Sequence, residues 1–270
     1  MNAVIRDIAI WGVRYHSRMN SHDPLRIAAW SGPRNISTAL MRSWENRPDT
    51  VVCDEPLYAH YLRVTGLNHP GREEVIAHHE TDWKIVVDGL CGDVGAPVFY
   101  QKHMAHHLLP EIDRDWLLQM TNIFLVRDPR EMITSLTKTI PNPTIDETGL
   151  PQQLELFESL CDAGDSPIIL DSKDILIDPR RMLATLCKHL EIPFYEEMLS
   201  WPAGQRDSDG IWASHWYASV EASTEFALWK RKEEQVPAEF ESLCLECEDI
   251  YLQLAERKMK PEGRGHAPNI

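Results

Sequence analysis

Short apolar runs alternate with amphipathic stretches through most of this chain, beginning at Leu25. Each apolar run is bounded by polar or turn-forming residues, which is typical of strands buried on both faces of a parallel sheet. The apolar runs predict strands at Arg26–Trp30, Thr50–Cys53, Pro97–Gln101, Asn122–Val126 and Pro167–Leu170. The amphipathic stretches predict helices at Ser37–Asn46, Gly71–His79, Thr81–Leu90, Pro129–Lys138, Pro151–Ala163 and Asp178–Leu190.

The repeated order of strand then helix predicts the fold class. Such a chain forms right-handed crossovers and an α/β fold, here a three-layer α/β/α sandwich with a central, mainly parallel sheet of about five strands. In such sheets, ligands bind beyond the carboxyl ends of the strands. Polar residues just past the predicted strand ends are therefore expected to form one site: Gly32, Arg34, Glu55, Lys102 and Arg127.

The alternation also suggests where the domain begins. Residues 1–24 show no clear period and predict a loosely attached N-terminal extension, so residues 25–270 are the expected domain. Residues 200–223 hold tryptophan, glycine and proline among polar residues, and they predict a long ordered loop. This loop either forms a lid over a substrate, with Trp212 and Trp216 in contact with it, or covers the core.

Composition and charge limit the classes of function. The hydrophobic fraction of 43% supports a substantial core, and the formal net charge of -15 argues against a nucleic-acid binder, whose footprint is basic. No segment predicts a membrane span or a signal peptide. Cys244 and Cys247 share a stripe of an amphipathic C-terminal helix predicted at 237–258, which favours a core face over a metal pair. We expect a cytoplasmic protein with a small-molecule partner, and a homodimer stays open.

The segment Ser31-Gly-Pro-Arg-Asn-Ile-Ser-Thr38 joins the first predicted strand to the first predicted helix. This order directs loop N–H groups and the positive end of a helix at one point, which suits an anion. Arg34 adds a fixed charge, and Ser37 and Thr38 add hydroxyl donors. A polar turn capped by Asn35 or Ser37 is the simpler alternative, because the lysine of the full P-loop pattern is absent.

Two later segments strengthen the anion hypothesis. Asn122-Ile-Phe-Leu-Val-Arg-Asp-Pro-Arg130 predicts a buried strand that ends at Arg127, followed by a helix that carries Ser135. Ile168-Ile-Leu-Asp-Ser-Lys-Asp-Ile-Leu-Ile-Asp-Pro179 predicts another strand, which an Asp-Pro and a helix follow. Together with the first loop, and in this order along the chain, these segments resemble the sulfotransferase superfamily and its soluble bacterial branch.

The resemblance implies a P-loop NTPase-like fold and binding of 3′-phosphoadenosine 5′-phosphosulfate (PAPS), with adenosine 3′,5′-bisphosphate as product and no metal. It assigns Arg127 and Ser135, which match the family's Arg-x7-Ser spacing, to the 3′-phosphate. It assigns the first loop to the 5′-phosphosulfate, through Gly32, Pro33, Arg34, Asn35, Ser37 and Thr38. The family usually has lysine where this chain has Arg34, and arginine stabilises charge but is a poor proton donor.

Glu55 lies in Cys53-Asp-Glu-Pro56, directly after the second predicted strand. Pro56 is expected to hold Glu55 extended and so to fix its position. Some members of the family have a similar Glu-Pro, with the glutamate proposed as general base. The resemblance therefore makes Glu55 a candidate catalytic base or a contact of the substrate.

The segment Lys102-His-Met-Ala-His-His107 offers rival bases. The family has Lys-x-His here, with the histidine as base, whereas His103 is one residue early and His106 and His107 lie on the following turn. We expect His106 or His107 to be catalytic, and Lys102 and His103 to contact the substrate. A metal site at His103 and His106 lacks a nearby third ligand, so no metal is expected.

The family's late, glycine-rich Arg-Lys-Gly loop, which also touches the 3′-phosphate, has no clear counterpart. Lys230, Arg231 and Lys232 are late and basic, but a solvated charge run is the favoured interpretation. We expect a PAPS-dependent sulfotransferase that moves a sulfuryl group to a small hydroxylated or amine-bearing metabolite. One alternative, an ATP-dependent P-loop phosphotransferase, is disfavoured because Gly-Lys-Ser/Thr and a carboxylate for magnesium are missing. The other is a non-catalytic nucleotide-binding protein that kept the fold.

Overall fold

The computed structural model describes residues 23–231 and 234–262. At its centre is a five-stranded sheet in the order β2-β3-β1-β4-β5, in which every neighbouring pair is parallel. The strands are β1 (Leu25–Ser31), β2 (Thr50–Asp54), β3 (Val98–Met104), β4 (Thr121–Val126) and β5 (Ile168–Asp171). All the predicted strands are confirmed. The largest difference is at β3, which continues beyond its predicted end at Gln101 as far as Met104.

Helices connect the strands and continue after the last one. They are α1 (Ser37–Glu45), α2 (Tyr58–Thr65), α3 (Arg72–His78), α4 (Trp83–Cys91), α5 (Pro129–Leu136), α6 (Leu150–Asp162), α7 (Ser172–Ile177), α8 (Pro179–His189), α9 (Ala213–Trp216), α10 (Ala218–Glu221) and α11 (Glu241–Ala255). The helices predicted between strands are all present, with small differences at their ends. The sequence pattern did not predict α2, α7, α9 or α10. Of these, α7, α9 and α10 are too short to show a clear period.

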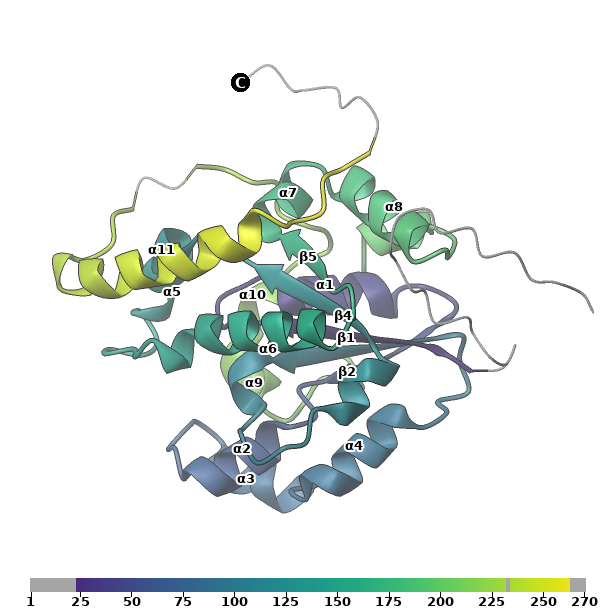
Figure 1. Cartoon of the computed structure of the whole chain (residues 1–270), viewed down its shortest axis with the longest axis horizontal. Helices are drawn as coiled ribbons and strands as arrows, with labels where there is room; N and C mark the ends of the chain where they lie inside the picture. The colour runs from purple at the N-terminus through teal and green to yellow at the C-terminus, as the bar shows by residue number, and fades with distance from the viewer. Residues whose placement is uncertain (1–22, 232–233, 263–270) are drawn as a thin grey trace, which may run out of the picture.

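Different helices cover the two faces of the sheet, which gives three layers (Figure 1). Helices α1, α7 and α8 pack on one face, and α4, α6 and the end of α11 pack on the other. Successive side chains of a strand point to opposite faces, so in β1 Ile27 and Ala29 join one core while Ala28 and Trp30 join the other. The α/β class and its three-layer form are therefore confirmed.

Side-chain caps fix where two helices begin beside the sheet. Asp128 accepts a hydrogen bond from the backbone N–H of Arg130 at 2.8 Å, and Pro129 occupies the start of α5. Asp178 caps α8 in the same way, by accepting from the N–H of Arg181 at 3.1 Å, and a proline again follows the cap. The turn from β4 into α5 is thereby held at the carboxyl edge of the sheet.

The C-terminal third contains more helix than the sequence predicted. Residues 200–223 do not form a continuous loop, because α9 and α10 lie within them. The helix predicted at 237–258 is present as a short 3-10 turn followed by α11, which packs on α5 and α6. Cys244 and Cys247 are buried in this contact, as their stripe predicted.

Two expectations fall on parts of the chain that are not described. The predicted N-terminal extension lies almost entirely outside the described residues, and so does Lys232. Within the described ranges, every helix is too short or too polar to cross a membrane.

Candidate active site

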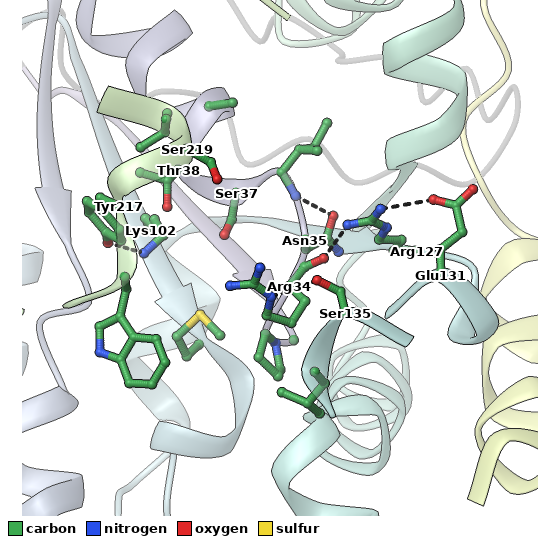
Figure 2. Close-up of a pocket in the computed structure, with 18 of the residues that line it drawn as sticks. Arg34, Asn35, Ser37, Thr38, Lys102, Arg127, Glu131, Ser135, Tyr217 and Ser219 are labelled. Atoms are coloured by element: carbon green, nitrogen blue, oxygen red, sulfur yellow. Dashed lines mark hydrogen bonds and ion pairs between the residues drawn. The ribbon is translucent and has the colours of Figure 1, made fainter. Parts of the chain in front are cut away.

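A cavity of about 650 Å³ opens beside the loop that follows β1. Its lining comes from that loop, the ends of β2 and β3, helices α2 and α5, the turn before α6 and the segment that includes α9 and α10. In Figure 2, Arg34 lies between Lys102 and Tyr217 on one side and Arg127 and Glu131 on the other. The cavity therefore has two ends, which the β1–α1 loop joins.

Close packing and an amide side chain hold the β1–α1 loop. A Cβ on Gly32 would overlap the carbonyl oxygen of Thr148, so glycine is required here. Arg34 has a φ of 55°, in the left-handed region that non-glycine residues seldom adopt. The Asn35 amide donates to the Leu125 carbonyl oxygen at 2.8 Å and accepts from the following backbone N–H at 2.8 Å. Asn35 therefore fastens the loop to β4.

Arg34, Arg127, Glu131 and Ser135 form what we call the arginine end of the cavity. Arg34 Nε donates to Ser135 Oγ at 2.9 Å. Arg127 donates through one nitrogen to the Arg34 carbonyl oxygen and through the other to Glu131 Oε2, at 2.9 Å in the latter bond. Burial and the nearby charge of Arg127 lower the pKa of Arg34. Two guanidinium groups thus lie close enough to repel each other, an arrangement that favours a bound anion.

The segment after α10 also reaches the arginine end. Trp229 donates its backbone N–H to the Leu176 carbonyl oxygen at 2.9 Å and its indole N–H to Glu131 Oε1 at 3.1 Å. These bonds bring the next two residues, Lys230 and Arg231, to the cavity, which both of them line while remaining exposed. Lys230 and Arg231 are thus exposed, as expected of a solvated charge run, and they line the cavity as well.

Rings from α2, the loop after α2, the turn after β3, and α9 gather at the opposite end. The ring centroids of Tyr58 and His107 are 4.7 Å apart in a stacked pair, and the Tyr61 ring lies 4.6 Å from the same imidazole. His69 Nδ1 lies 2.9 Å from the Tyr58 hydroxyl, and its ring is 6.5 Å from that of Trp216. We call these five residues the aromatic end, and all of them line the cavity.

A buried ion-pair network of Asp54, Glu55, Lys102 and Tyr217 lies beside these rings, and from here on the aromatic end includes this network and His106. Lys102 Nζ donates to Asp54 Oδ1 at 2.8 Å, to Tyr217 Oη at 2.8 Å and to Glu55 Oε1. The Tyr217 hydroxyl in turn donates to Asp54 Oδ2 at 2.7 Å. Burial opposes the charge on Lys102, but the carboxylates of Asp54 and Glu55 outweigh it and raise the pKa of Lys102 well above its ordinary value. One ammonium group thus offsets two carboxylates.

Glu55 adopts an unusual backbone conformation. Its φ is 42°, so the expectation that Pro56 holds it extended is wrong. The Glu55 N–H donates to the Lys102 carbonyl oxygen at 2.9 Å, and the Glu55 carbonyl oxygen accepts from the Tyr58 N–H at 3.0 Å. These bonds hold a strained residue of the kind that clusters at functional sites. Burial raises the pKa of the Glu55 carboxyl, and Lys102 offsets this only in part.

His106 and His107 lie on the turn after β3, where the sequence placed them. Burial, then the neighbouring His69, lower the pKa of His106 to about 3, and burial also holds the pKa of His107 well below its ordinary value. The Nδ1 atoms of both are buried without a hydrogen-bond partner among the described residues. His107 Nδ1 is 4.0 Å from Glu55 Oε2. These neutral imidazoles can bind a polar ligand but are weak bases.

Most residues that the sequence assigned to the site line the cavity. From the β1–α1 loop and α1 these are Gly32, Pro33, Arg34, Asn35, Ser37 and Thr38. From the other segments they are Glu55, Lys102, His106, His107, Arg127, Ser135 and Trp216. They come together because parallel strands end at one edge of the sheet, where the intervening loops converge.

His103 and Trp212 do not line the cavity, contrary to expectation. Because β3 is longer than predicted, Lys102 and His103 lie inside the strand and face opposite sides of the sheet. The His103 ring stacks on Trp30 with 4.3 Å between centroids, in the core on the face away from the cavity. Trp212 is 2% exposed and donates its indole N–H to Tyr217 Oη at 3.3 Å. Trp212 therefore supports the ion-pair network through its bond to Tyr217, without lining the cavity.

Several residues that line or support the cavity were not predicted from the sequence. Tyr58 and Tyr61 carried a usable signal, since they are three residues apart just after Glu55 and so lie on one face of a helix. Tyr217 carried none, because its partner Asp54 is 163 positions away. Such a contact depends on the tertiary fold and leaves no mark on local spacing.

The sequence of the chain is similar to those of known proteins. A family model described as "Sulfotransferase domain" matches residues 25–239. Two Arabidopsis thaliana proteins, named branched-chain-amino-acid aminotransferase-like protein 1 and protein 2, are 38% identical over 210 residues and 34% identical over 226 residues. These matches cover 77% and 83% of this chain but 38% and 40% of the relatives, so the chain spans about two fifths of their length.

Two solved structures share the fold. The sulfotransferase domain from the curacin biosynthetic pathway has a TM-score of 0.53 at 16% identity, covering 89% of this chain and 100% of that one. A sulfotransferase from Alicyclobacillus acidocaldarius has a TM-score of 0.51 at 10% identity, covering 87% of this chain and 97% of that one. At these identities the likeness extends to the arrangement of strands and helices.

Proposed function

Because the chain belongs to the sulfotransferase domain family, we propose that it transfers a sulfuryl group from PAPS to a small alcohol or amine. The observation that carries the proposal is the pairing of two unlike ends in one cavity, with guanidinium groups at one end and an ion-paired, buried glutamate at the other. Sulfuryl transfer needs an anion site for the departing phosphate and a base beside the acceptor. The two ends supply these separately.

The arginine end suits the nucleotide. In the proposal, Arg127 and Ser135 bind the 3′-phosphate, while Arg34 and the loop N–H groups bind the 5′-phosphosulfate. The repulsion that lowers the pKa of Arg34 would be relieved by a bound anion. Lys230 and Arg231 add positive charge from the segment after α10, in place of the family's glycine-rich loop. Arg34 stabilises the charge that builds on the leaving phosphate, and its guanidinium keeps its proton.

Glu55 is the base that the electrostatics favour. Burial raises the pKa of its carboxyl, which makes the carboxylate a stronger base. The pKa of His106 is about 3, so its imidazole holds a proton too weakly to compete. Lys102 binds Glu55 Oε1, while Oε2 faces His107 at the aromatic end. An acceptor hydroxyl at that end would therefore meet the unpaired oxygen of the carboxylate.

The alternative of an ATP-dependent phosphotransferase has less support. Magnesium would need an available carboxylate beside the phosphates. Glu131, the carboxylate of the arginine end, accepts instead from Arg127 and Trp229. The aminotransferase-like names of the relatives describe proteins of which this chain covers about two fifths, so those names do not define its activity.

Transfer from radiolabelled PAPS tests the proposal. The purified chain is incubated with labelled PAPS and a panel of neutral, cationic and anionic alcohols and amines, with magnesium ATP as the rival donor. We expect labelled product from PAPS alone, inhibition by adenosine 3′,5′-bisphosphate, and loss of transfer in Arg34→Ala. Phosphoryl transfer from ATP would overturn the proposal, and bisphosphate binding without transfer to any acceptor would favour a non-catalytic nucleotide-binding protein.

A further inference from the structure

We infer that the aromatic end selects an alcohol that carries a protonated or quaternary amine, an inference that rests on the proposed transfer function. Three observations point to this class of acceptor: excess negative charge, aromatic residues that line the same cavity, and an imidazole nitrogen beside Glu55 that has no partner among the described residues.

The charge at this end is negative. Asp54 and Glu55 are offset by the single ammonium of Lys102. Glu147 lines the same cavity, and its Oε2 accepts from the backbone N–H of Thr144 at 2.8 Å, a bond that does not neutralise it. The other lysines and arginines among the described lining residues belong to the loop and the arginine side. A ligand cation would therefore complete the balance of charge.

The negative charges at this end also raise the pKa values of the tyrosines there. After burial, the largest causes that raise the pKa of Tyr61 to about 12 are the charges of Glu147 and Asp146. Burial and then Glu55 raise the pKa of Tyr58 as well. A field that opposes a phenolate at these positions attracts a cation to the same place.

Ring faces give this cation a second source of stabilisation. Tyr58, Tyr61 and Trp216 line the cavity around His69, and the face of a tyrosine or tryptophan ring attracts a cation through its quadrupole. Rings alone would accept a neutral apolar group equally well. The carboxylates decide between the two, because they stabilise a cation and repel an anion.

The hydroxyl of such an acceptor has a defined place. The His107 side chain is 3% exposed, its Nδ1 has no partner in the described part of the chain, and Glu55 Oε2 lies 4.0 Å away. One hydroxyl can accept from the His107 Nδ1–H, in the tautomer that carries the proton there, and donate its own proton to Glu55. A cation nearby also opposes the effect of burial on the Glu55 pKa, so the base stays ionised when the acceptor is present.

Binding of matched probes tests this inference by a readout other than turnover. Choline, dimethylbutanol (which replaces the charged nitrogen by carbon) and the anion glycolate are titrated into the full chain saturated with adenosine 3′,5′-bisphosphate. We expect choline to bind about tenfold or more tightly than dimethylbutanol, with glycolate weakest. Glu147→Gln, which keeps an acceptor for Thr144, and Tyr61→Leu should each reduce the choline preference severalfold. Glu158→Gln, exposed on α6, should not.

The outcomes separate the two proposals. Equal binding of choline and dimethylbutanol, no binding of any probe, or an unchanged preference in both Glu147→Gln and Tyr61→Leu would overturn the inference. Thermal unfolding of each variant with the bisphosphate shows whether it is folded. Failure of the proposed function appears earlier, as absence of bisphosphate binding. In that case the probes are titrated into the chain without bisphosphate, and the ratio of choline affinity to dimethylbutanol affinity again tests the inference.

Discussion

The arginine end and the aromatic end of the cavity handle charge in opposite ways. At the arginine end, two guanidinium groups bond to a carbonyl, a hydroxyl and one carboxylate and still repel each other. At the aromatic end, one buried ammonium group is surrounded by two carboxylates, and the histidines are neutral. The first end is suited to an anion by its excess of positive charge. The second is suited to a proton transfer, because burial raises the pKa of Glu55 and lowers the pKa of His106 and His107.

This difference implies that substitutions at the two ends should impair different properties of the protein. Loss of a cation at the arginine end removes attraction for a ligand. Loss of a charged group in the buried network leaves its partners unpaired, so catalysis or folding suffers.

The largest effect is expected for Glu55→Gln. Glutamine keeps the size of the side chain and one acceptor oxygen, but it cannot take a proton. We expect kcat to fall about 10²–10⁴-fold while the affinity for adenosine 3′,5′-bisphosphate is preserved. Steady-state kinetics with labelled PAPS, together with calorimetry, measure both quantities. If His107→Asn carries the loss in kcat while Glu55→Gln only raises KM, the assignment of the base is wrong.

Lys102→Met should destabilise the fold. It leaves Asp54 and Glu55 buried without their cation, which costs about 3–5 kcal/mol of unfolding free energy. The loss should shrink as the pH falls, because burial raises the pKa of the Glu55 carboxyl and its protonation removes an unpaired charge. Urea unfolding at several pH values measures it. Lys188→Met is the matched control, since its ion pair with Glu262 is 70% exposed on the lysine side and should contribute less than about 1 kcal/mol. Equal losses in the two variants would contradict the buried network.

A smaller effect concerns His103 in the core behind the aromatic end. Burial, then Lys102, lower its pKa to about 3 in the folded chain, below the ordinary value near 6.5. Its contribution to stability is therefore present above about pH 6.5 and is lost as the pH falls towards 3. At roughly pH 5 the loss is about 2 kcal/mol. His103→Gln should show a shallower fall of the urea midpoint between about pH 7.5 and 5 than the natural chain. Parallel curves would argue that this histidine titrates alike in the folded and unfolded chain, so that the core does not lower its pKa.

The two ends also differ in how far the sequence revealed them. Arg127 directly follows β4 and Ser135 lies on the next helix, α5, so both belong to one short segment, and the family resemblance paired them and supplied a role. The β1–α1 loop could be predicted for a similar reason, because its strand, turn and helix follow one another in consecutive residues. The sheet followed from apolar runs for the same reason.

The aromatic end depended on contacts that spacing cannot show. Tyr217 and Asp54 meet only after the chain has folded, and a slightly longer β3 turned His103 away from the cavity. The left-handed φ of Glu55 was also hidden, because proline usually favours an extended neighbour and hydrogen bonds here override that preference. In the sequence, Lys230 and Arg231 have the pattern of a solvated charge run. Their place in the cavity lining depends on the bond between Trp229 and Glu131, which local spacing does not show.

Nucleotide titration tests the central claim, that the arginine end binds a 3′-phosphorylated nucleotide, most directly. Adenosine 3′,5′-bisphosphate and adenosine 5′-phosphate are titrated into the natural chain, Arg127→Ala and Arg130→Ala. Arg130 lies three residues after Arg127, at the start of α5, but bonds to Glu241 and Glu248, away from the cavity. We predict that Arg127→Ala weakens binding of the bisphosphate by about tenfold or more, the value of a charge-assisted hydrogen bond, with little change for the monophosphate and none in Arg130→Ala. Equal weakening of both nucleotides, or no preference for the bisphosphate in the natural chain, would contradict the claim.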